Sequence, residues 1–130
     1  MQLSIITSIR TNNFNDKHVM DKIKNMWESA SKSLTNYEGN VYGVYYDYES
    51  DYKGDYSIGV ATEKNGGTPI EITTEKHEIF KVDSTDDQGV FKAWSNIWNL
   101  EESGTLNRAY TVDFEKYLPN GEIEIHIAVE

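Results

Sequence analysis

One short phrase occurs twice in this chain, half a chain apart. An aspartate, an aromatic residue and a glutamate stand in a row at 47–49 and again at 113–115, and each copy precedes a tyrosine, a glycine and a run typical of a β-strand. A repeat at this spacing indicates one supersecondary unit used twice. The chain of 130 residues is therefore expected to fold as two related halves, about 1–64 and about 70–130.

The length and composition fit a single domain over residues 1–130. A chain of this size can bury a substantial core but has no room for a second domain of ordinary size, such as a DNA-binding module. It contains no cysteine, which excludes a disulfide framework, a thiolate zinc site and a cysteine nucleophile. Its nine tyrosines and three tryptophans supply both core volume and flat surfaces for planar ligands.

Apolar spacing predicts the same order of elements in both halves. Alternating runs rich in β-branched and aromatic residues predict strands, and apolar residues three and four positions apart predict helices. In the first half these signals predict a strand from residue 3 that ends at 11–13, and strands at 41–49 and 56–63. Between them they predict a helix that Asn15 or Asp16 caps, whose apolar stripe runs from Val19 to Leu34 and which ends near 35–36. In the second half they predict a strand at 77–83 that residues 70–73 can extend, a helix opened by Asp86 and Asp87 and stopped at 103–104, and strands at 108–117 and 122–129.

These elements predict an α+β fold. Two pseudo-twofold-related β-α-β-β repeats would form an antiparallel sheet, with two helices packed on one face and a ligand groove between the repeats. Alternation along the strands divides the side chains between the two faces. The apolar set expected to face the helices is Val44, Tyr46, Tyr48, Tyr56, Ile58, Val60, Tyr110, Val112, Phe114, Ile123, Ile125, Ile127 and Val129.

Acidic residues fall on the other face in the same alternation. Asp113 and Glu115 are expected there, opposite Glu124 and His126, and Glu49 takes the equivalent place in the first half. Gly59 is predicted to leave space above the sheet, because it has no side chain to pack. Glu49, Glu115 and nearby tyrosines in such a groove would suit a planar or bulky organic cation. The alternative is a solvated face whose acids serve solubility.

The second half resembles a known family. The sequence 110–118 followed by 122–129, preceded by the helix 89–98 with its Trp94, is similar to the C-terminal signature of gyrase-inhibitor-like effector-binding domains. Such domains end AraC-type and MerR-type multidrug-responsive transcription activators and also occur as stand-alone proteins. The chain looks most like stand-alone members carried on mobile gene cassettes, which bind cationic drugs. The resemblance covers essentially the whole chain and implies the two-repeat fold.

The resemblance also implies a ligand-binding residue. In this family the glutamate of a Phe-Glu-x-Tyr motif meets the positive charge of the ligand inside an aromatic pocket, and here that residue is Glu115. Around it we place Asp113, Tyr45, Tyr46, Trp94, Tyr110 and Tyr117, although strand alternation puts Tyr46 and Tyr110 on the helix side. Trp27 and Trp98 are assigned to the core. The predicted function is non-enzymatic binding of small hydrophobic, cationic or amphipathic organic compounds, for sensing or for sequestration, without a cofactor or a metal.

Charge limits the other partners. The net charge of −10 repels phosphate backbones, which argues against direct nucleic-acid binding, and the family's upstream DNA-binding domain has no counterpart here. A separate regulator protein is the partner through which such a domain could act on transcription. No apolar stretch approaches about 18 residues, so no membrane span is predicted, and the start of the chain lacks the features of an export signal. We expect a cytoplasmic protein.

Two rival functions stay open at this point. The acids Asp113, Glu115 and Glu124 with His126 could form an acid/base cluster, which would make the protein a small-molecule hydrolase. The acidic surface could instead dock on a basic partner, as an interaction module of the gyrase-inhibitor type. Acids gathered on a convex face would favour docking, and one or two acids inside a concavity would favour ligand binding.

Overall fold

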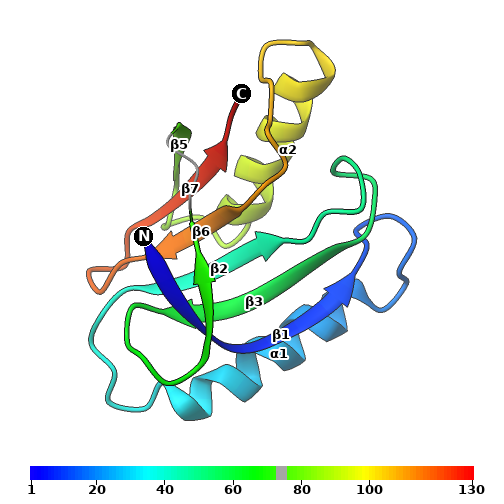
Figure 1. Ribbon diagram of the computed structural model, residues 1–130. Coiled ribbons are helices and arrows are strands. Elements are labelled where there is room, and N and C mark those ends of the chain that lie inside the picture. The colour runs from blue at the N-terminus through cyan, green and yellow to red at the C-terminus, as the bar shows by residue number, and fades with distance from the viewer. Residues whose placement is uncertain (73–75) are drawn as a thin grey trace.

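The structure is a computed structural model, and it describes residues 1–72 and 76–130. Within these residues the chain forms one antiparallel sheet of seven strands and two helices (Figure 1). The elements follow one another as β1 (Gln2–Thr11), α1 (Val19–Ser33), β2 (Val41–Tyr46), β3 (Tyr56–Thr62), β4 (Thr68–Glu71), β5 (His77–Val82), α2 (Gly89–Glu102), β6 (Asp113–Tyr117) and β7 (Ile123–Ala128). The predicted α+β class is confirmed.

The sheet has the order β4-β1-β3-β2-β6-β7-β5. In the first half β3 lies between β1 and β2, and in the second half β7 lies between β5 and β6. The two halves therefore have the same order of pairing, and β4 is an additional strand beside β1. The halves meet where β2 pairs with β6. A twofold relation between the halves and a groove between them stay predictions.

Both helices pack on the same face of the sheet. The strand register brings one row of residues to that face, namely Val60, Gly43, Glu115 and Ile125 on β3, β2, β6 and β7. Helix α1 buries Met26 near Val60, at one end of this row. Helix α2 buries Ile97 near Ile125, towards the other end. The middle of the row, at Gly43 and Glu115, therefore lies between the parts of the sheet that the two helices cover.

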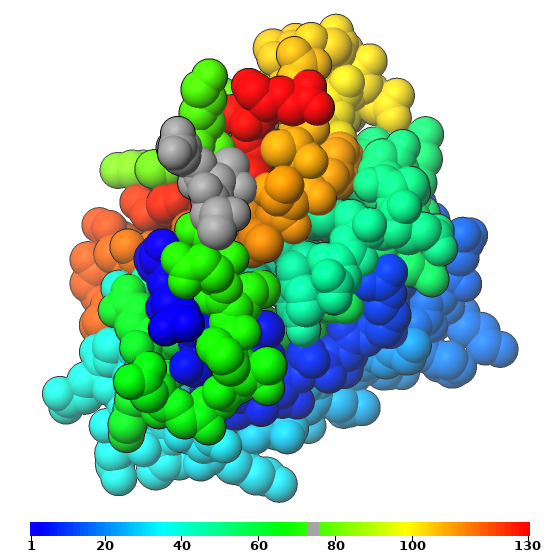
Figure 2. Space-filling model, in the orientation of Figure 1, coloured from blue at the N-terminus to red at the C-terminus, as the bar shows by residue number. Residues whose placement is uncertain are grey.

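The opposite face carries a core of its own. Its buried members are Leu3, Ile5, Tyr42, Val44, Ala61, Ile72 and Phe114. The first residues of β1 pair with β4, and Figure 2 shows these two segments, in blue and green, lying over the face turned to the viewer. The expectation of one apolar face and one open, acidic face was therefore wrong, because the chain covers both.

This double coverage explains an error in the faces assigned to β2 and β6. Tyr45, Asp113 and Glu115 lie on the helix side, whereas Val44, Tyr46, Val112 and Phe114 belong to the opposite core. Alternation separates the two sets of side chains but cannot say which set faces the helices when both faces are buried. The faces predicted for β3 and β7 are confirmed, with Ile58 and Ile125 on the helix side.

Two residues with left-handed backbone shorten the central strands. Asp47 has a φ of 50° and Tyr110 a φ of 55°, in a backbone region that residues other than glycine seldom adopt. Strand β2 therefore ends at Tyr46 rather than at residue 49, and β6 begins at Asp113 rather than at residue 108. The break after Tyr46 returns Tyr48 to the helix-side core, where it was predicted.

The predicted meeting of Asp113 and Glu115 with His126 and Glu124 does not occur. His126 aligns with Phe114 and stacks on it, with ring centroids 4.5 Å apart, on the face opposite Glu115. Its Nε2 lies 3.0 Å from Glu124 Oε1 on the same strand. This prediction failed because Asp113 and Glu115 of β6 were assigned to the face away from the helices, where His126 does lie, whereas they lie on the helix side.

Both helices begin later than their predicted caps. Helix α1 begins at Val19 and α2 at Gly89, and neither has a side-chain cap. Asp16 and Asp86 instead accept hydrogen bonds from backbone N–H groups two residues further on, each at 2.9 Å. Asp16 also accepts a bond from Lys22 at 2.5 Å, and these contacts lower the pKa of Asp16 to about 2.

Gly59 serves close packing rather than a groove. A Cβ atom at this position would lie 3.0 Å from Ile5 Cγ2 and 3.2 Å from the carbonyl oxygen of Thr7, so β1 approaches β3 there. The run at 70–73 does not extend β5, because Ile70 and Glu71 belong to β4 and pair with β1; residue 73 lies outside the described residues. Among the residues that the structure describes, no helix has the length and apolar character needed to cross a membrane.

Candidate functional site

Glu115 is a buried carboxylate in the centre of the sheet. It is 3% exposed, in the middle of β6, and aligns with Gly43 of β2 and Ile125 of β7. Three side chains from three elements donate hydrogen bonds to it. Tyr45 Oη and Trp94 Nε1 reach Oε2 at 2.8 and 2.7 Å, and Tyr117 Oη reaches Oε1 at 2.7 Å.

More aromatic rings surround these donors. Tyr45 packs against Trp94, with ring centroids 4.9 Å apart, and Tyr117 packs edge-on against Trp27 of α1 at 5.3 Å. The two helices thus each contribute a tryptophan, one on either side of Glu115. The structure brings together four predicted site residues: Glu115, Tyr45, Trp94 and Tyr117.

Gly43 and Trp27 belong to this site although the sequence did not indicate them. A Cβ atom on Gly43 would lie 3.0 Å from Glu115 Oε1 and 3.3 Å from Trp27 Cζ2, so the missing side chain leaves room for the carboxylate. The available signal was a glycine inside a strand between large residues, which often marks a close approach of another group. Trp27 was assigned to the core alone, because its helical spacing matches a buried stripe.

The polar surroundings of Glu115 supply hydrogen bonds but no positive charge. Among the described residues, no ion pair with a lysine, arginine or histidine involves it. Burial, and then the negative charge of Glu115, raise the pKa of the Tyr45 hydroxyl well above its usual value, and the same causes raise the pKa of Tyr117. Both hydroxyls therefore remain protonated donors across the physiological pH range.

Asp113, two residues before Glu115, has quite different partners. It is fully buried and accepts hydrogen bonds from Arg108 Nη2 at 2.6 Å, from the backbone N–H of Ala128 at 2.7 Å and from the Tyr48 hydroxyl. Its charge is therefore compensated inside the protein, whereas that of Glu115 is not. The two acids that strand alternation placed together have separate tasks.

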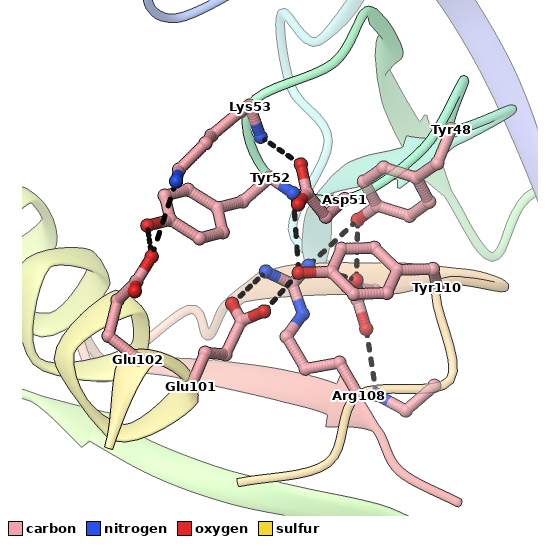
Figure 3. A network of polar contacts seen from close by, with 10 residues as sticks. Tyr48, Asp51, Tyr52, Lys53, Glu101, Glu102, Arg108 and Tyr110 are labelled. Atoms are coloured by element: carbon pink, nitrogen blue, oxygen red, sulfur yellow. Dashed lines mark hydrogen bonds and ion pairs between the residues drawn. The ribbon is translucent and has the colours of Figure 1, made fainter. Parts of the chain in front are cut away.

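The remaining predicted site residues lie apart from Glu115. Tyr110 packs on Arg108 and donates a hydrogen bond to Glu101 (Figure 3). Tyr46 packs against the core on the opposite face of the sheet. Glu49, the counterpart of Glu115 in the repeated phrase, is exposed in the β2–β3 connection, where its N–H bonds to the carbonyl oxygen of Asp55. The repeated phrase thus has different surroundings in its two copies.

Two hollows on the surface lie away from Glu115. One of about 690 Å³ lies between the end of α1 and the 64–67 connection, and one of about 480 Å³ lies beside residues 10–18. Neither is lined by Glu115 or by the rings around it. No group of three or more histidine, aspartate or glutamate side chains within the described residues is placed to hold a metal ion.

The fold and this site define the class of protein as a small α+β domain in which two helices and an antiparallel sheet enclose the carboxylate of Glu115 among aromatic rings. The chain belongs to the family of integron-associated effector-binding proteins, described as Cass2, whose family model matches residues 4–129. This confirms the resemblance stated from the sequence.

A solved structure agrees with this assignment. The crystal structure of integron cassette protein VCH_CASS2, from the mobile metagenome of Vibrio cholerae, is similar to this chain with a TM-score of 0.83 and 28% sequence identity. The alignment covers 100% of this chain and 90% of that one. The comparison with curated proteins gives no match.

Proposed function

We propose that this protein binds small hydrophobic organic cations without transforming them, and that Glu115 meets their positive charge. The observation that supports this most is a buried carboxylate held by three uncharged donors, with no cationic side chain paired to it. The family description, effector binding, supports the same class of function. Sensing and sequestration of a cationic effector both use this one binding step.

The physical reason lies in the cost of burying a charge. A carboxylate removed from water loses hydration energy that hydrogen bonds from neutral groups restore only in part. A lipophilic cation supplies the missing opposite charge, and its apolar groups pack on the surrounding rings. The ligand class is therefore a bulky or planar organic cation rather than a small hydrated ion.

Binding requires the rings above Glu115 to move. Neither of the two surface hollows is lined by Glu115, and the donors Tyr45, Trp94 and Tyr117 occupy its oxygens. A ligand would enter between the halves, displace some of these donors and take their place as the partner of Glu115. We assign direct contacts to Glu115 and these three aromatic residues. Asp113 and Tyr110 support the site from the Arg108 side, and Tyr46 has no part in it.

The test compares a charged dye with its neutral form. Crystal violet and leuco crystal violet share three aryl rings, but only the first is a permanent cation. In Glu115→Gln we expect the affinity for crystal violet to fall roughly 30-fold or more, because a buried charge pair loses one partner. Fluorescence titration should show less than about a threefold change for the leuco form, which makes no such pair.

Glu49→Gln is the matched control for this experiment. It removes an exposed acid from the other copy of the repeated phrase and should leave both affinities unchanged. Equal losses for both dyes in Glu115→Gln would show that the glutamate acts through shape and not through charge. Failure of the unaltered protein to bind crystal violet, rhodamine dyes and tetraphenylphosphonium in a thermal-shift screen would remove the proposal.

A further inference from the structure

Arg108 occupies a closed compartment beside the Glu115 site. It lies in the connection between α2 and β6, and its side chain is only 2% exposed. Its Nη1 lies 2.8 Å from Glu101 Oε1, and its Nη2 lies 2.6 Å from Asp113 Oδ2 and 3.3 Å from the Tyr48 hydroxyl. Figure 3 shows the guanidinium between Glu101 and the rings of Tyr48 and Tyr110.

Three aromatic rings complete this compartment. The guanidinium carbon lies 4.4 Å from the ring centroid of Tyr110 and 5.7 Å from those of Tyr48 and Trp94. Rings at these distances attract a cation through their electron-rich faces. Two carboxylates and three rings around one positive charge are the components of a cation-binding cage, which we call the Arg108 cage.

The polar groups of the cage contact the two terminal nitrogens of Arg108 and not its Nε. The two terminal nitrogens take up the carboxylates, whereas Nε is buried and has no hydrogen-bond partner among the described residues. A buried donor without a partner is unfavourable, and optimised structural ion pairs seldom leave one. The two terminal nitrogens make all of the carboxylate contacts, so a flat cation with two forked nitrogens can make the same contacts, and an amidinium makes them without a third buried nitrogen.

We propose that the Arg108 cage is a second cation site, specific for guanidinium and amidinium groups, and that the chain's own arginine fills it. A fork of two N–H groups matches the separate carboxylates, and a flat delocalised cation stacks on Tyr110. A compact ammonium group would meet the charge but not the stacking. The cage would thus bind one class of cation, and the side chain of Arg108 prevents other molecules from entering it.

This occupancy sets the charge that an incoming ligand meets. Trp94 is shared by the two sites, because its Nε1 donates to Glu115 while its ring faces Arg108. With Arg108 in place, both cage acids have a guanidinium nitrogen as partner, whereas Glu115 has no cationic partner among the described residues. A second positive group of a ligand near Trp94 would find both cage carboxylates already bonded to the guanidinium and would gain no direct contact with them. This consequence rests on the proposed function: Arg108 restricts the protein to ligands with a single charge.

The first test is chemical rescue of Arg108→Ala. This change removes the atoms of one ethylguanidinium unit and leaves Asp113 buried without its cation, so the variant should be strongly destabilised. Ethylguanidinium at about 50 mM should then raise its Tm by on the order of 5 °C, because only the folded state binds the ion. Ethylammonium should raise it much less, and neutral N-ethylurea not at all. The unaltered protein, whose cage is filled, should show no rise.

The outcomes remain decisive if Arg108→Ala fails to fold alone. Recovery of the near-ultraviolet circular dichroism of its tryptophans during titration with ethylguanidinium would then be the supporting result. Absence of recovery, or an equal response to N-ethylurea, would overturn the proposal. Arg108→Ala with Asp113→Asn provides the matched control: it removes one carboxylate of the cage and should lose the response to ethylguanidinium.

The second test concerns ligand charge. A series of aliphatic diamidines with different spacers is compared with monoamidines of the same length. In the unaltered protein the second amidinium should improve affinity by no more than about twofold, its statistical advantage. In Arg108→Ala at least one spacer should bind roughly tenfold more tightly than its monoamidine. If each diamidine and its monoamidine bind Arg108→Ala with equal affinity at every spacer length, Arg108 does not restrict the charge of the ligand. The rescue experiment tests the cage independently, because its result does not require Glu115 to bind a cation.

Discussion

Glu115 remains buried because its neighbours donate three hydrogen bonds and because Gly43 has no side chain. The first is a matter of residue type, since Tyr45, Trp94 and Tyr117 each end in a single donor group. The second is a matter of space, since a Cβ atom on Gly43 would reach the carboxylate at 3.0 Å. At the scale of the residue, the site depends as much on a missing side chain as on those present.

We expect Gly43→Ala to impair ligand selection more than stability. The new methyl group meets the flexible end of Glu115 and the edge of Trp27, both of which can shift, so the loss in free energy of unfolding should stay below about 1 kcal/mol. The displaced carboxylate should lower crystal violet affinity about three- to tenfold. Titration and urea unfolding measure the two effects.

Gly59→Ala is the control for that substitution. Its methyl group would lie 3.2 Å from the backbone oxygen of Thr7, which cannot shift without moving β1. It should therefore destabilise the protein by about 1–3 kcal/mol while the preference for crystal violet over its leuco form stays unchanged. A Gly43→Ala variant with unchanged dye preference would contradict the close approach described for Glu115.

At the scale of the element, the two central strands carry one polar set and one apolar set on faces that are both buried. On β6, Glu115 lies under the helices and Phe114 lies in the opposite core. Alternation correctly separated these two residues. It assigned the apolar one to the helices, since nothing local showed that β1 and β4 contribute to a core on the other face.

His126 on β7 makes that opposite face sensitive to pH. Burial, partly offset by the contact with Glu124, lowers the pKa of His126 below its ordinary value of 6.5. The unfolded chain then binds a proton at higher pH than the folded one, so stability is complete above about pH 6.5 and falls as the pH drops through the lower pKa of the folded state. We expect His126→Phe, which keeps the stacking on Phe114, to weaken this decline.

Urea unfolding at pH 7.5, 6.5 and 5.5 measures the effect. His18→Gln, a change of an exposed histidine on the other side of the molecule, should keep the slope of the unaltered protein. If His126→Phe loses as much stability on acidification as the parent, groups other than His126 set the response.

At the scale of the whole molecule, the net charge of −10 and the buried carboxylate of Glu115 would attract a cation over different distances. The surface charges attract cations through a field that salt screens within about 8 Å at physiological ionic strength. Glu115 is 3% exposed, so a cation bound to it would interact by contact in a region shielded from salt. The overall affinity for a cation is therefore expected to contain a part that salt removes and a part that it does not.

We expect added salt to weaken cation binding without abolishing selectivity. Raising sodium chloride from about 20 mM to about 500 mM should lower the affinity for tetraphenylphosphonium several-fold by screening the surface field. The ratio of affinities between the unaltered protein and Glu115→Gln should stay constant, because the buried contact is not screened. Isothermal titration at both salt concentrations provides the measurement. A ratio that falls to one at high salt would place the effect of Glu115 at the surface.

The sequence determined the local features of this protein. Periodicity alone identified both helices, the hairpins and their order. Apolar residues three or four positions apart indicate a helix, and apolar residues two positions apart indicate a strand, so both signals lie within one segment. The family signature singled out Glu115, and three of the aromatic residues placed around it, Tyr45, Trp94 and Tyr117, donate hydrogen bonds to it.

Only the tertiary structure decided which face each acid occupies and which acids are neutralised. Asp113 and Glu115 have the same alternation on one strand, yet Arg108 compensates the first and uncharged donors alone surround the second. Pairing of β2 with β6 places Gly43, and with it Trp27, next to Glu115. The left-handed backbone at Asp47 ends β2 before Glu49, which therefore lies outside the site. The physical reason is that burial and charge compensation depend on contacts between distant segments, which alternation within one strand does not contain.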